Sequence, residues 1–94
     1  MHILNGSCSV IGTLSKEVYS LRIRCQSILS SILISRDESL LKRLRNELTN
    51  LEKRRAEIFN MASSMRNEEN LDRLSVELLL EIASRPLNYY PNMI

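Results

Sequence analysis

The chain is poor in the residues that make tight turns and aromatic cores. Its 94 residues include no tryptophan, one phenylalanine, three tyrosines, two glycines and two prolines. A β-sandwich or barrel needs frequent turns, so this scarcity of glycine and proline favours an all-α fold. A chain of this length buries only about 60–65% of its unfolded surface. We therefore expect one small helical domain, residues 1–94, that gains further burial from a partner or from a second copy of itself.

The residue sets of an enzyme or a metal centre are also missing. His2 is the only histidine, so no histidine follows any serine or cysteine that could act as a nucleophile. No acidic cluster completes a zinc site with the two cysteines, Cys8 and Cys25. We expect Cys25 to be a buried small apolar residue. We expect no enzymatic activity, no cofactor, no metal and no small-molecule substrate.

Long apolar runs are absent too. Residues 1–12 have neither the basic start nor the continuous apolar stretch of a signal peptide. The longest apolar stretches, such as Ile32–Ile34 and Leu78–Leu80, are far shorter than the roughly 20 residues of a membrane-spanning helix. These features predict a cytoplasmic protein without a membrane span.

Two stretches carry apolar residues at alternating steps of three and four, which is the heptad pattern of helices that pack along one another. In residues 13–34 the pattern comprises Leu14, Val18, Leu21, Cys25, Ile28 and Ile32. In residues 36–65 it comprises Leu41, Leu44, Leu48, Leu51, Ile58 and Met65, with the charged Arg55 at one position of the seam. The two patterns predict two helices that form a coiled coil.

The heptad phase breaks between these stretches, at Ser35-Arg36-Asp37-Glu38. A serine followed three residues later by glutamate is a capping box, which starts a helix. A short turn here makes the two helices antiparallel neighbours, so we predict a coiled-coil hairpin. Because the turn contains neither glycine nor proline, a single long kinked helix is the alternative.

A shorter third helix is predicted over residues 68–84, and Pro86 prevents it from continuing. Residues 85–94 are expected to form an extended tail. Residues 1–12 are expected to form a flexible arm, with an ordered strand as the alternative. The third helix carries apolar side chains around much of its circumference, so it must be covered on more than one side, by the hairpin or by another chain.

The patterns favour a non-catalytic protein-interaction module, such as a small adaptor, chaperone or assembly factor. We expect its partner to bind the exposed remainder of the apolar faces, namely Val76, Leu79 and Leu80 in the third helix and Leu87, Tyr89 and Tyr90 in the tail. A homo-oligomer is also expected, and Arg55 either sets its register or lies exposed where the seam has drifted. In architecture alone, a hairpin of this length resembles the small coiled-coil chaperones that hold subunits of bacterial type III secretion needles, although no motif carries that resemblance.

The alternative function is a small basic regulator that contacts nucleic acid. Two basic clusters in the second predicted helix stand about 16 Å apart at the helical rise of 1.5 Å per residue. They comprise Lys42, Arg43 and Arg45, and then Lys53 and Arg54. Basic clusters on one helix face can follow a phosphate backbone. Interleaved acidic residues and a net charge of only +2 weaken this hypothesis.

Overall fold

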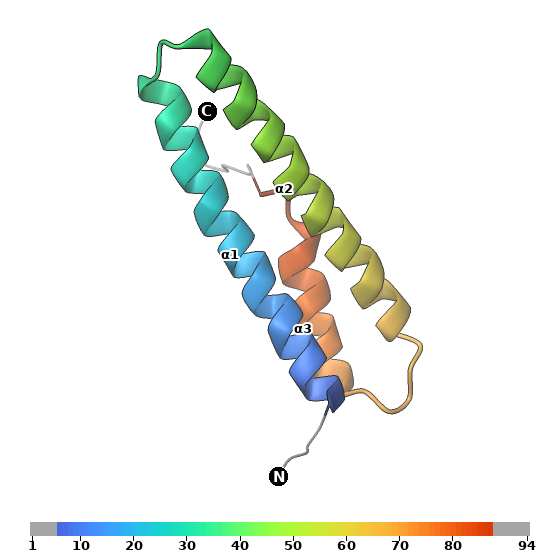
Figure 1. Cartoon of the computed structure of the whole chain (residues 1–94). Coiled ribbons are helices and arrows are strands. Elements are labelled where there is room, and N and C mark those ends of the chain that lie inside the picture. The colour runs from blue at the N-terminus through green and yellow to red at the C-terminus, as the bar shows by residue number, and fades with distance from the viewer. Residues whose placement is uncertain (1–5, 88–94) are drawn as a thin grey trace.

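The computed structural model describes residues 6–87, with side chains from Val10 onward. Within this range the chain forms three helices and no strand: α1 is Gly6–Ile34, α2 is Glu38–Met65 and α3 is Arg73–Ser84. Figure 1 shows α1 and α2 as the two long helices, with α3 packed between their lower halves. The all-α prediction is therefore confirmed for the described residues.

The helices α1 and α2 lie side by side and run in opposite directions (Figure 1). Two ion pairs between the helices agree with this antiparallel arrangement. Arg54 of α2 donates to Glu17 near the start of α1, and Arg24 further along α1 donates to Glu47 earlier in α2, both with closest distances of 2.6 Å. The chain turns back over residues 35–37, so the alternative of one long kinked helix is not found.

The turn uses a different cap from the one expected. The carboxylate of Asp37 accepts the backbone N–H of Ser39 at 3.0 Å and that of Leu40 at 3.4 Å, so Asp37 is the N-cap and α2 begins at Glu38 rather than at residue 36. Ser35 is not the cap because its backbone N–H still donates to the carbonyl of Ser31, which continues the hydrogen bonding of α1. An aspartate is as good an N-cap as a serine, and here it lies at the point where the chain has left α1.

The prediction of a flexible arm over residues 1–12 is wrong from Gly6 onward, because α1 already begins there. Residues 1–5 lie outside the described part. Ile11 stands one helical step before Leu14, and both side chains are buried in the core. Burial of Ile11 favours continuing the helix through Gly12, whose own cost in a helix interior is about 1 kcal/mol relative to alanine.

Gly12 offers a direct test of this helical start. A Cβ atom at Gly12 would meet nothing within 4 Å, so alanine fits without a clash. Gly12→Ala should raise the free energy of unfolding by about 0.5–1 kcal/mol and the melting temperature by roughly 2–8 °C. Thermal unfolding followed by circular dichroism measures the shift. A lower melting temperature would mean that residue 12 is not in an open helical position.

The third helix is shorter than predicted at its start. It begins at Arg73, not residue 68, because Asp72 is its N-cap and accepts the backbone N–H of Ser75 at 3.3 Å and its hydroxyl at 2.6 Å. Residues 66–72 form the connection from α2, and α3 ends at Ser84, as predicted from Pro86.

The main core lies where the three helices meet. Its buried members come from every helix: Ile11, Leu14, Val18, Ile58, Ala62, Val76, Leu79, Leu80 and Ala83. The helix α3 covers only the half of the α1–α2 pair that contains the start of α1 and the end of α2 (Figure 1). The other half, near the turn at residues 35–37, consists of two helices. None of the helices in the described range has the length and apolar character that crossing a membrane requires.

Candidate protein-binding site

The apolar residues predicted to bind a partner are buried within this chain. Val76, Leu79 and Leu80 of α3 face the core, and Leu87 is buried just beyond the helix. The expected exposure of these four side chains is therefore not found, because α3 packs its most continuous apolar face against the two long helices. Tyr89 and Tyr90 lie outside the described residues.

The opposite face of α3 exposes two other leucines. Leu74 is 67% exposed and Leu78 is 55% exposed. Side chains four residues apart lie next to each other on one helix face. Together they line an open groove of about 460 Å³ whose other wall includes Phe59 and Ser63 of α2. The groove is thus an apolar strip between α2 and α3 that the chain itself leaves accessible.

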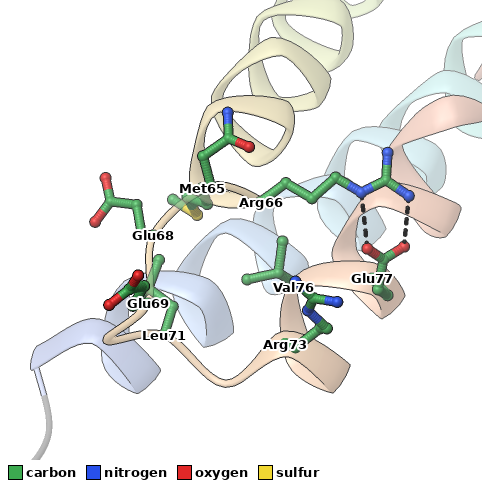
Figure 2. Close-up of a pocket in the computed structure, with 9 residues that line it drawn as sticks. Met65, Arg66, Glu68, Glu69, Leu71, Arg73, Val76 and Glu77 are labelled. Atoms are coloured by element: carbon green, nitrogen blue, oxygen red, sulfur yellow. Dashed lines mark hydrogen bonds and ion pairs between the residues drawn. The ribbon is translucent and has the colours of Figure 1, made fainter.

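Charged side chains border this groove. Arg66 at the end of α2 donates two hydrogen bonds to Glu77 of α3, at 2.8 and 3.1 Å (Figure 2). This bidentate contact, with two parallel hydrogen bonds, is the stronger form of an arginine–carboxylate pair, and it joins the end of α2 to α3. Glu81, further along α3, also lines the groove and pairs with Arg85 at 3.4 Å. The border therefore presents both signs of charge.

A second pocket, of about 450 Å³, lies on the other side of the Arg66–Glu77 pair, against the connection between α2 and α3. Figure 2 shows Glu68 and Glu69 of the connection across from that ion pair, with Arg73 at the start of α3. Most of the lining side chains are charged or amide, so this pocket does not continue the apolar strip. Among the side chains that the structure describes, from Val10 to Leu87, no three histidine, cysteine or acidic groups come together as metal ligands would.

Arg55, expected either to set the register of an oligomer or to lie exposed, is held inside the chain. Its side chain is 13% exposed and pairs with Glu52, one turn earlier in α2. Its Nη1 donates to the carbonyl of Ala83 at 2.7 Å, which caps the last turn of α3. Glu52 also accepts the backbone N–H of Leu87 at 3.0 Å. Burial raises the pKa of Glu52, but the hydrogen bonds from Arg55 and Leu87 outweigh it, so the net pKa is lowered.

The basic residues of α2 divide into paired and exposed groups. Arg54 donates to Glu17 at 2.6 and 3.0 Å and to Glu57 at 3.2 Å. These hydrogen bonds raise the pKa of Arg54 and lower that of Glu17. The other members of the two basic clusters are exposed: Lys42, Arg43, Arg45 and Lys53. Pairing of Arg54 leaves the second cluster with less charge for a phosphate backbone than the sequence indicated.

The exposed pair Leu74 and Leu78 was not predicted from the sequence, which instead indicated Val76, Leu79 and Leu80 as the exposed residues of the third helix. The residues that pack inward are Val76, Leu79, Leu80 and Ala83, which also follow helical spacing. Two apolar stripes lie on this short helix, and the way in which α3 packs against α1 and α2 determines which of them is buried.

A scan of the chain against family models, curated proteins and solved structures finds no match.

Proposed function

We propose that the chain is a non-catalytic protein-interaction module that binds an amphipathic helix of a partner protein in the groove between α2 and α3. The observation that carries the proposal is the exposed pair Leu74 and Leu78 beside the half-buried Phe59. An amphipathic helix places apolar side chains at steps of three and four, which suits a strip lined by residues four apart. At the border of the groove, Arg66, Glu77 and Glu81 provide charged groups for ion pairs with the polar side chains at the edge of such a helix.

Covering this strip supplies part of the free energy that a specific contact needs. Fully burying a leucine side chain contributes about 1.5–3 kcal/mol, so two leucines that are already half to two-thirds exposed offer about 2–4 kcal/mol. Phe59 adds the part of its aromatic surface that the chain leaves accessible. Apolar residues near the centre of an interface with charges at its edge match the usual anatomy of protein contacts.

The scaffold in this proposal is an antiparallel coiled-coil hairpin, with α3 as the element that presents the strip. Buried seam residues Val18, Cys25 and Ile28 on α1 support that reading of the heptad pattern. The helix that binds the strip belongs to another protein in this proposal, and binding by a second copy of this chain is the outcome that the experiment below distinguishes from it.

The test replaces both exposed leucines, Leu74→Ser with Leu78→Ser, in the full chain purified with a tag from its own host. We expect the variant to keep its helical content and melting temperature, because neither side chain is in the core. We expect it to lose its bound protein, or its self-association, by about tenfold or more in affinity, since two apolar contacts are removed. Quantitative mass spectrometry of the captured proteins and the native mass of the chain provide the two readouts.

A matched control exists on α1. Tyr19 and Ile23 are also four residues apart and are 55% and 69% exposed. The double variant Tyr19→Ser with Ile23→Ser removes a similar amount of exposed apolar surface away from the groove, and it should bind as the natural chain does. Equal losses from the two double variants, or no loss from the α3 variant, would contradict the proposal.

The alternative proposal, nucleic-acid contact through α2, has weaker support because Arg54 is held by Glu17 and Glu57. The exposed cations Lys42, Arg43, Arg45 and Lys53 are what remains of that face. Phosphate contacts weaken steeply as salt rises, whereas apolar helix packing does not. A complex that survives high salt favours the α2–α3 groove, and nucleic acid that is released by salt favours the α2 face.

A further inference from the structure

The chain beyond α3 is held by side chains from both long helices. Arg22 of α1 donates to the carbonyls of Ile82, Arg85 and Pro86, the last two at 3.3 and 3.4 Å. From α2, Glu52 accepts the N–H of Leu87 at 3.0 Å. The backbone at Arg85 is extended, and the Leu87 side chain is 7% exposed. These contacts direct the chain away from α3 and onto the groove between α1 and α2.

Leu87 marks the start of an apolar groove that leads away from α3. A pocket of about 260 Å³ lies beside Leu87 and is lined also by Cys25 of α1 and by Leu48, Thr49 and Glu52 of α2. Further toward the turn at residues 35–37, half-buried Leu29, Ile32, Leu41 and Leu44 continue the apolar positions of the two helices. Leu41 also lines a pocket with the charged side chains of Glu38, Lys42 and Arg45. No part of α3 lies over this distal half of the α1–α2 pair (Figure 1).

We propose that this distal groove is the docking site for the chain's own residues 88–94, which lie outside the described residues. Their sequence, Asn-Tyr-Tyr-Pro-Asn-Met-Ile, contains no charged side chain and has four large apolar or aromatic ones. That chemistry suits an apolar groove, and proline is acceptable there because an extended segment between two helices needs no continuous backbone hydrogen bonding. The inference is independent of the proposed function, which uses the separate groove between α2 and α3.

The reach of the segment agrees with the length of the groove. From Glu52, which holds Leu87, to Glu38 at the start of α2 is 14 residues, or about 21 Å of helix. Seven extended residues span at most about 23–25 Å. The segment can therefore follow the groove from Leu87 to the turn. In this position it covers the distal half of the α1–α2 pair, as α3 covers the other half.

A disulfide in the full chain tests this placement. Leu44 lies one helical turn beyond Leu48 on the same side of α2, about 6 Å further along, and Tyr90 is three residues beyond Leu87, within about 10 Å of extended chain. With Cys8 and Cys25 replaced by serine and alanine, the pair Leu44→Cys and Tyr90→Cys should form an intramolecular disulfide on mild oxidation. The control pair is Asn46→Cys with Tyr90→Cys.

The control cysteine at residue 46 stands at nearly the same height on α2 but is exposed on the opposite side of the helix. We expect the pair with residue 44 to cross-link about tenfold or more faster than the control, because docking raises the local concentration of one thiol near the other. Equal rates for the two pairs would overturn the proposal. A disulfide between two chains would overturn it as well, because the groove would then hold the segment of another copy.

A second measurement avoids engineered cysteines in the groove. Cys25 is buried beside Leu87, and burial raises the pKa of its thiol. The second variant combines Tyr89→Ser with Tyr90→Ser in a chain that also carries Cys8→Ser. It should raise the reactivity of Cys25 toward a thiol reagent by about tenfold, because without the docked segment the groove opens more often. The matched change Tyr19→Ser with Ile23→Ser should leave that reactivity unchanged. Unaltered reactivity in the Tyr89 and Tyr90 variant would contradict the docking.

Discussion

Leu79→Ala should lower the free energy of unfolding by about 2–5 kcal/mol, the usual cost of emptying a leucine site in a core. Leu79 is 0% exposed and lies in the cluster where all three helices meet. A domain of this size has only about 5–15 kcal/mol of stability in total, so the variant is expected to unfold at a much lower urea concentration. Urea unfolding followed by circular dichroism gives the difference.

The neighbouring residue is the control for this prediction. Leu78 is the same residue type, in the same helix, but it is 55% exposed. Leu78→Ala should change the free energy of unfolding by less than about 1 kcal/mol, because little buried surface is lost. If the two variants lose similar stability, the orientation of α3 described above is wrong, and if only Leu78→Ala is destabilising, α3 is rotated.

Arg55→Leu should destabilise the chain by about 1–3 kcal/mol, although it places an apolar residue on an apolar seam. The substitution leaves the Glu52 carboxylate without its arginine and the carbonyl of Ala83 without its donor. Burial disfavours the ionised form of Glu52, and the lowered pKa shows that its hydrogen bonds overcome this effect. Without Arg55, the cost of burial at Glu52 is no longer offset to the same extent. Urea unfolding at neutral pH measures the loss.

Arg54→Leu is the matched control, since Arg54 is the adjacent residue and also pairs with carboxylates. Its side chain is 38% exposed, and water screens its contacts with Glu17 and Glu57. The expected loss is therefore about 1 kcal/mol or less. A stable Arg55→Leu chain that self-associates more tightly, or that has a different native mass, would favour the other role considered for this residue, which is to set the register of an oligomer.

The two long helices could be predicted from the sequence because their heptad patterns are long and regular. Val18, Cys25 and Ile28 follow the steps of the first pattern, and all are buried. The break of phase at residues 35–38 correctly placed the end of α1, since a polar segment cannot continue an apolar seam. The cap within that segment could not be chosen, because Ser35 and Asp37 both have side chains suited to the position.

The surface of α3 could not be predicted because almost every side of this helix carries an apolar residue. Leu74 and Leu78 belong to one helical stripe, and Leu79 and Leu80 belong to another. Which stripe faces inward depends on how α3 meets α1 and α2. The polar contacts of Arg22 and Glu52 with the chain at and beyond the end of α3 had no sequence signal either, since both residues lie in long helices among other charges.

The start of α1 was missed for a different reason. Asn5-Gly6 and Gly12 are turn signals, and local signals of this kind predict a break. Ile11 nevertheless lies three residues before Leu14, so it extends the first apolar pattern by one step. Burial of that one side chain in the three-helix core outweighs the cost of a glycine inside the helix.

The most direct test of the account measures two properties of one variant, Leu74→Ser with Leu78→Ser in the full chain. Our proposal is that the strip on α3 binds a partner helix and contributes little to the fold. It predicts an unchanged melting temperature together with loss of the salt-resistant complex or of self-association. A melting temperature that falls as far as that of Leu79→Ala, or a complex that is retained in full, would contradict it.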